Sequence, residues 1–306
     1  MLSVFGIREG WNKFFFDQVS AVPVGAFRAI FGLITLIDGL MLFPYRFTWF
    51  GETGVMPYLT ARQYTGGLRL DLFAVWPHDD LGVTLFMILH ILACVFLMLG
   101  SFSRVSAATV FATLVTLHHR NTLILNSGDT ILRLFSFFLA LAPCGAAFSL
   151  DRMWRQRRSA KPLPSPMMTA WPLRLMQIQF SLIYIASVAW KLEGGSWLDG
   201  SALYYTSRLV SFHRFPVPFF FNQLWFLRIG TWASLVIEAG LGIGIWFKEL
   251  RYPALIAGVL LHLGIDYTMN IPLFEWISMS LFILFVDVKE VRRAAQYLSP
   301  KLAALA

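Results

Sequence analysis

The stretch Leu81–Leu99, LGVTLFMILHILACVFLML, decides the fold class of this chain. It contains no Asp, Glu, Lys or Arg, and its length approaches the roughly 20 residues that a helix needs to cross a bilayer. Ile229–Phe247 and Leu273–Val286 are also long and apolar, with few charges. Of the 306 residues, 57% are apolar and 14% are charged, whereas a soluble domain is about 45–50% apolar and about a quarter charged. The sequence therefore predicts a helical membrane protein whose main partner is the lipid bilayer.

Eight apolar segments predict an all-α fold, a polytopic membrane helix bundle of about eight transmembrane helices with two long outer-face loops. The segments are Val22–Phe43, Leu81–Leu99, Val105–Leu117, Thr130–Ala147, Pro172–Trp190, Ile229–Phe247, Tyr252–Tyr267 and Leu273–Val286. No internal repeat, low-complexity tract or interdomain linker separates them. Residues 1–306 are therefore expected to form a single membrane domain.

Basic residues in the short loops predict the orientation of the bundle. The strongest groups are Arg152, Arg155, Arg157, Arg158 and Lys161, followed by Lys289, Arg292 and Arg293. Because cytoplasmic loops are enriched in Lys and Arg, we expect a multi-pass protein of the cell membrane with both termini in the cytoplasm. The loops Tyr45–Asp80, His118–Asp129 and Lys191–Gln223 then lie outside, and the two longest are candidate site elements.

Charge and the N-terminal segment exclude two other interpretations. The net charge is +8, but the basic residues lie in loops between apolar segments rather than along one polar face, which argues against a nucleic-acid partner. The first apolar segment has no small-residue cleavage pattern after a short core, so no removable signal peptide is expected.

Polar side chains recur every three or four residues along the fifth predicted span and end at Lys191. They are Arg174, Gln177, Ser181, Tyr184, Ser187 and Lys191. One interpretation is a seam of hydrogen bonds between helices, with Lys191 reaching the membrane interface. The other is a catalytic base at Lys191, because apolar surroundings disfavour the ammonium and only the neutral amine can abstract a proton.

His262, Asp266 and Asn270 fall on one face of the seventh predicted span, at intervals of four residues. Such a face could relay protons, or it could hold a structural hydrogen bond between His262 and Asp266. The other histidines supply no matching helical pair with a carboxylate, so no metal site is expected.

Two further charged groups need partners. Asp129 and Arg133 lie one turn apart at the start of the fourth span and are expected to form a salt bridge. Glu238 lies within the sixth span, and its candidate partners are Arg28, Arg174 and Lys191.

Several short motifs resemble one known family. They are Phe27-Arg28-Ala29-Ile30-Phe31-Gly32, Asn126-Ser127-Gly128-Asp129, Ser149-Leu150-Asp151, and Lys191-Leu192-Glu193 followed by Trp197-Leu198-Asp199-Gly200. On these residues the chain resembles the horizontally transferred transmembrane (HTTM) domain, the membrane domain shared by vitamin K-dependent gamma-carboxylase and compact bacterial relatives. One such relative matures a secreted sporulation-delaying toxin. The resemblance implies a bacterial inner-membrane protein.

By the same resemblance, Lys191 matches the carboxylase lysine that deprotonates vitamin K hydroquinone and so starts an oxygen-dependent epoxidation. Two features depart from the carboxylase. The histidine that follows an asparagine there has no counterpart in Asn126-Ser127-Gly128-Asp129, and the chain given ends at Ala306 without the carboxylase's large lumenal domain. Carboxylation of a partner protein is therefore not expected.

Three hypotheses follow. The first is an intramembrane enzyme that acts on a reduced quinone or an exported peptide, with Lys191 as base, Tyr184 and Asp129 as polar partners, and His262 and Asp266 as a relay. The second is a non-catalytic maturation or export factor for a secreted peptide, acting with a co-encoded maturation protein. A proton-coupled transporter ranks last, because no inverted repeat is evident.

Overall fold

The computed structural model describes residues 4–64, 70–299 and 305–306. Nearly all of their regular structure is helical, so the predicted all-α class is confirmed. The chain divides into two compact units, and we describe each by itself. Unit 1 comprises Met1–Leu175 and Val286–Ala306, and unit 2 comprises Met176–Phe285.

Unit 1 contains most of the N-terminal helices and one short strand pair. Its elements are α1 (Val4–Phe16), β1 (Gln18–Ser20), α2 (Val22–Leu42), η1 (Phe43–Tyr45), α3 (Arg46–Phe50), α4 (Tyr58–Tyr64), η2 (Leu72–Ala74), α5 (Asp80–Leu99), α6 (Ser103–Arg120), α7 (Ser127–Leu141), α8 (Leu150–Arg158), β2 (Met167–Thr169) and α15 (Val288–Leu298). Helix α9 (Trp171–Leu192) begins in unit 1 and ends in unit 2.

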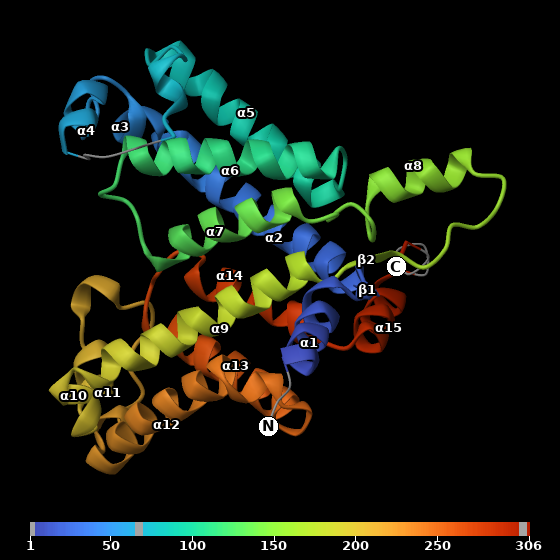
Figure 1. Ribbon diagram of the computed structural model, residues 1–306. Helices are drawn as coiled ribbons and strands as arrows, with labels where there is room; N and C mark the ends of the chain where they lie inside the picture. Colours follow the sequence, from blue (N-terminus) through green and yellow to red (C-terminus); the bar gives the residue numbers. More distant parts are fainter. Residues whose placement is uncertain (1–3, 65–69, 300–304) are drawn as a thin grey trace. The chain divides into compact units, whose positions relative to one another are not determined.

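Helices α2, α5, α6 and α7 form the core of unit 1 (Figure 1). α2 packs along α5, and α6 packs against both α5 and α7. Gly32 allows the close approach of α2 to α5, because a Cβ there would lie 2.5 Å from the backbone nitrogen of Met98. Phe27 of α2 meets Phe135 of α7 edge-on, with ring centroids 5.8 Å apart. Small residues and aromatic rings thus hold this helix layer together.

The strand pair is a feature that the sequence analysis missed. β1 and β2 are antiparallel, with Val19 opposite Met168. Each strand has three residues, which is too short for an alternating hydrophobic pattern to be recognised. The pair joins the chain just before α2 to the chain just before α9.

Unit 2 contains the end of α9 and the helices that follow it. Its elements are α10 (Gly195–Leu198), α11 (Ala202–Thr206), η3 (Val210–Phe212), η4 (Phe219–Asn222), α12 (Leu224–Gly242), η5 (Gly244–Trp246), α13 (Lys248–Thr268), α14 (Phe274–Ser280) and η6 (Leu281–Phe285). Gly242 of α12 lies against Ile185 of α9, and Gly258 of α13 lies against Leu241 and Phe282. Because glycine has no side chain, these positions again permit close contact between helices.

Four helical segments of the described residues are long and apolar enough to cross a membrane. They are Val22–Phe50, Asp80–Leu99, Trp171–Leu192 and Leu224–Gly242. Large apolar side chains on α5 remain exposed at helical spacing: Leu81, Leu85, Ile88, Leu89, Leu92, Phe96 and Leu99. A stripe of this length, unpaired within the protein, is suited to contact with lipid.

Each of the eight predicted spans contains helix, but three differ clearly in extent from the prediction. The sixth was predicted as Ile229–Phe247, whereas α12 begins at Leu224 and ends at Gly242, before η5. The fourth was predicted to reach Ala147, whereas α7 ends at Leu141 because Pro143 follows the C-cap residue Ala142. The eighth changes from α14 to the 3₁₀ helix η6 after Ser280.

Candidate functional site

The polar stripe of α9 connects this helix to four other elements of unit 2. Gln177 donates to the carbonyl of Leu284 at 2.7 Å, and Ser181 accepts from the indole of Trp246 at 2.7 Å. Tyr184 bonds His262 at 2.7 Å, and Ser187 donates to Glu238 at 3.0 Å. The three-to-four-residue spacing predicted from the sequence therefore does correspond to one face that bonds to η6, η5, α13 and α12.

Lys191 ends this stripe and forms an ion pair with Glu238 of α12. The side chain of Lys191 is 22% exposed and that of Glu238 is 8% exposed. The ring of Trp197, on α10, lies 4.7 Å from the ammonium nitrogen. Among the three partners that the sequence offered for Glu238, the structure selects Lys191.

His262 lies between a tyrosine and a carboxylate. Its Nε2 is 2.7 Å from the hydroxyl of Tyr184, and its Nδ1 contacts Glu275 at the start of α14. With Glu275 ionised and His262 neutral, Nδ1 donates to Glu275 and Nε2 accepts from the Tyr184 hydroxyl, since an ionised carboxylate only accepts. Glu275 is 1% exposed. The sequence analysis did not identify Glu275 as a partner of His262, because i, i+4 spacing cannot show a partner on another helix.

Asp266 is directed to a different partner. It pairs with Arg214 at 2.5 Å, and Arg214 belongs to the long segment between α9 and α12. Nearby, the backbone N–H of Asn270 donates to the carbonyl of Phe212 at 2.6 Å. Both ring nitrogens of His262 are engaged elsewhere, so the structure does not join His262 and Asp266. Asp266 and Asn270 instead attach that long segment to the end of α13.

Asp129 belongs to unit 1, whereas the other four candidate residues belong to unit 2. It forms a capping box at the start of α7: Asn126 Oδ1 accepts from Gly128, and Asp129 Oδ2 accepts from the backbone of Asn126, both at 2.6 Å. His118 lies 3.6 Å from Asp129 Oδ1. Within the described residues Asp129 forms no ion pair with Arg133, which donates to Thr130 at 3.3 Å.

The deepest histidine of unit 1 is His90, which the sequence analysis left without a role. Its Nδ1 lies 2.8 Å from the hydroxyl of Thr113 and its Nε2 lies 3.6 Å from the sulfur of Cys94. Thr113 gives its own proton to the carbonyl of Thr109 at 2.8 Å, so His90 Nδ1 is the donor and Nε2 can accept from the thiol. This arrangement holds α5 against α6.

The motif after Lys191 forms the turn that carries Trp197. Hydrogen bonds from the side chain and backbone of Ser201 hold the pKa of Asp199 below its ordinary value, and the backbone bond is 2.8 Å long. Gly200 has φ 84°, a conformation that glycine adopts without strain. An ionised Asp199 thus fixes the turn between α10 and α11.

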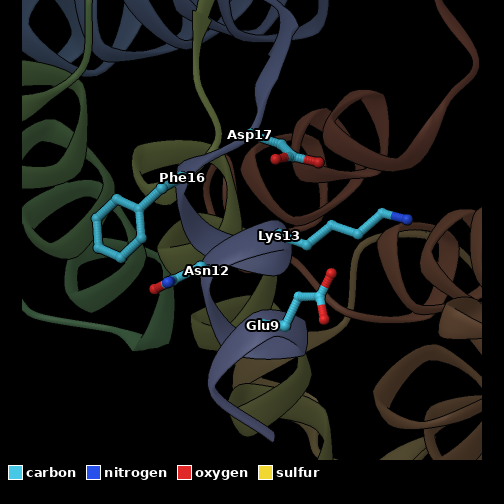
Figure 2. A pocket seen from close by; sticks show the side chains of 5 residues that line it. All are labelled: Glu9, Asn12, Lys13, Phe16 and Asp17. Atoms are coloured by element: carbon cyan, nitrogen blue, oxygen red, sulfur yellow. The ribbon is translucent and has the colours of Figure 1, made fainter. Parts of the chain in front are cut away.

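A hollow of 540 Å³ lies along α1 and is lined by Glu9, Asn12, Lys13, Phe16 and Asp17. Figure 2 shows that the side chains of Glu9, Lys13 and Asp17 extend to one side of the helix and that of Phe16 to the other. It contains none of the candidate residues. No group of three or more His, Cys, Asp or Glu side chains arranged for a metal occurs in the part of the chain that the structure describes.

The sequence pattern that defines the HTTM domain matches residues 16–289. The chain belongs to the HTTM family. This match includes every motif and every candidate residue described above, and together with the long apolar helices it identifies an HTTM-domain membrane protein. Comparisons of this HTTM protein with curated proteins and with solved structures find no match.

Proposed function

We propose that this HTTM protein crosses the bilayer eight times and is an intramembrane enzyme in which Lys191 and Glu238 together accept a proton from a lipid-soluble substrate. The substrate class that fits is an aromatic compound with an acidic hydroxyl, such as a reduced quinone. Such a compound would meet the ring of Trp197 beside the Lys191 amine.

The observation that carries the proposal is the position of Glu238. It lies in α12, one of the apolar helices long enough to cross a membrane, and its side chain is 8% exposed. An acidic group in such a helix costs free energy that an ion pair does not fully recover. An ion pair kept there is therefore better explained by function than by stability.

The pair can take up a proton without creating an isolated charge. Glu238 accepts the proton, while Lys191 remains an ammonium and stabilises the oxygen anion that the substrate becomes. In this scheme the base is the Lys191–Glu238 pair rather than a neutral Lys191 alone, because the two side chains form an ion pair. Ser187, which donates to Glu238, positions the carboxylate.

Tyr184 extends this site toward His262 and Glu275. It is hydrogen-bonded to His262, which contacts Glu275, and it lies one turn before Ser187, which donates to Glu238. In our proposal these side chains carry the proton away from Glu238. Asp266 is not part of this relay; it pairs with Arg214 in the segment between α9 and α12. Asp129 caps α7 and takes no part in the proton transfer.

The test uses purified protein in lipid nanodiscs, loaded without oxygen with ubiquinol, menaquinol or vitamin K hydroquinone and then exposed to oxygen. Oxygen uptake and the products, a quinone epoxide and water, are measured. Glu238→Gln should abolish turnover because an amide cannot accept the proton, and Lys191→Arg should do so because the larger planar guanidinium cannot replace the compact ammonium beside the substrate oxygen. Lys248→Arg, an exposed lysine of the same unit, is the matched control and should behave as wild type. A stable Lys191→Ala protein with full turnover would remove the catalytic proposal.

The second candidate function is the non-catalytic maturation factor for an exported peptide. It is favoured by the internal pairing of this cluster, since Lys191, Glu238, Tyr184 and His262 all have protein partners. Under this function the pair only supports the fold, so Lys191→Arg, and the exchange of both charges in Lys191→Glu/Glu238→Lys, should keep activity. A small secreted peptide encoded beside this protein would also favour it.

A further inference from the structure

The N-terminus of α6, residues 143–146 and the helix α8 border a second, open hollow in unit 1. Its volume is 230 Å³, and its lining includes two arginines, Arg104 of α6 and Arg155 of α8, together with Asp151. None of these three residues belongs to the candidate site in unit 2. Both arginines are exposed.

Both carboxylate oxygens of Asp151, the acidic residue of this hollow, accept hydrogen bonds. Asp151 Oδ1 accepts from the backbone of Phe102 at 2.8 Å. Its Oδ2 accepts from the backbone of Ser103 at 2.9 Å and from the Ser103 hydroxyl at 2.7 Å. Asp151 thus acts as the cap of α6, where a carboxylate is also favoured by the helix dipole.

The two guanidinium groups keep several donors uncommitted. Arg104 Nε donates to the carbonyl of Ala142 at 3.3 Å, and Arg155 donates through Nε to Asp151 O at 3.2 Å and through Nη2 to Gly145 O at 3.0 Å. Among the residues that the structure describes, no partner is recorded for Arg104 Nη1 and Nη2 or for Arg155 Nη1. Their remaining N–H groups line a hollow and match the oxygens of a phosphate.

An exposed aromatic residue lies close to each arginine in the sequence, Phe102 before Arg104 and Trp154 before Arg155. Phe102 is 65% exposed and Trp154 is 41% exposed, and their ring centroids are 6.3 Å apart. Phe102 is moreover held at φ 47°, a conformation that costs a bulky side chain energy, by the bond to Asp151. The start of α6 and the helix α8 therefore carry both the two arginines and the two exposed aromatic rings. A molecule with an anionic group and an apolar part could contact both.

We propose that this hollow binds the phosphate of an anionic phospholipid between Arg104 and Arg155, with Phe102 and Trp154 against the acyl chains. Further along the same segment Arg157, Arg158 and Lys161 add positive charge, and these attract anionic headgroups without forming the site. The amphipathic helix α8 then lies along the membrane surface. The proposal does not depend on the function assigned to Lys191.

The test is lipid retention by the full-length protein, measured by native mass spectrometry in detergent with phosphatidylglycerol or phosphatidylcholine added. Wild type should retain phosphatidylglycerol in preference. Arg104→Gln/Arg155→Gln should lose at least about tenfold in retention, since two charge-assisted hydrogen-bonding groups are removed. Arg157→Gln/Arg158→Gln removes the same charge outside the hollow and should keep most of the retention. If the glutamine variant does not fold, Arg104→Lys/Arg155→Lys, which preserves both charges, replaces it in the retention measurement.

The following comparisons distinguish binding in this hollow from non-specific attraction of anionic lipid to basic residues. Equal loss in the two glutamine variants, or equal retention of both lipids by wild type, would overturn the proposal. Inorganic phosphate should bind far more weakly than phosphatidylglycerol, because it lacks the apolar part, and equal binding would assign the hollow to a soluble phosphate compound instead. Brominated phosphatidylglycerol should quench wild-type fluorescence more than that of Trp154→Phe, and unchanged quenching would remove the aromatic pair from the proposal.

Discussion

At the scale of single residues, the buried Arg28 of unit 1 donates to backbone carbonyls. Arg28 has no exposed surface, and its guanidinium donates to the carbonyls of Leu97, Met98 and Phe148, the last two at 3.0 and 2.5 Å. Arg28→Leu would remove this donor from all three carbonyls, although that of Leu97 still accepts from the Gly100 N–H, and each carbonyl left without a donor costs about 1–3 kcal/mol. We expect a large loss of thermal stability in detergent, while Arg157→Gln, which is exposed, should melt as wild type.

Replacing each of two carboxylates of unit 2 by leucine should reduce the stability of the protein by clearly different amounts. Asp266 pairs with Arg214, whose side chain is 37% exposed, so Asp266→Leu should cost no more than about 1 kcal/mol. Glu275→Leu would leave His262 Nδ1 without an acceptor where the side chain is 5% exposed, and should cost about 1–3 kcal/mol. Denaturation curves of the two variants measure the difference, and equal losses would contradict the assigned partners.

At the scale of elements, the start of α7 depends on its capping box. Asn126→Ala removes the acceptor of the Gly128 N–H and should cost about 1 kcal/mol of stability. Ser127→Ala, at the next and exposed position, is the matched control and should cost little. If Asn126→Ala instead left stability unchanged but abolished activity, Asp129 and its motif would belong to the active site after all.

At the scale of the whole molecule, the prediction concerns topology. Cysteines placed at Thr122 and Gly194 should react with an impermeant reagent from outside the cell, and a cysteine at Gln156 should not, because the Lys and Arg groups near Gln156 favour the cytoplasm. A reporter fused after Ala306 should report a cytoplasmic location. Replacing the buried Cys94 and Cys144 first removes background labelling. Labelling of Thr122 and Gly194 from opposite sides would contradict the eight-span topology.

Much of the fold could be predicted because helix-forming apolar segments carry their signal locally. The predicted Leu81–Leu99 coincides with α5 within one residue, since Asp79 and Gly100 cap its two ends. The predicted end of α7 was wrong because Pro143 stops the helix, although the apolar composition continues beyond it. The strand pair was missed because its register depends on residues far apart in the chain.

The sequence by itself determined the family, through its short motifs. It also determined the helical membrane class and the face of α9 that carries polar side chains, since these depend on composition and on periodicity along one segment. Only the tertiary structure decided the partners. Glu238 pairs with Lys191, and His262 contacts Tyr184 and Glu275 rather than Asp266. Helical periodicity fixes the direction in which a side chain points but not the helix that it meets, because that depends on how distant segments pack.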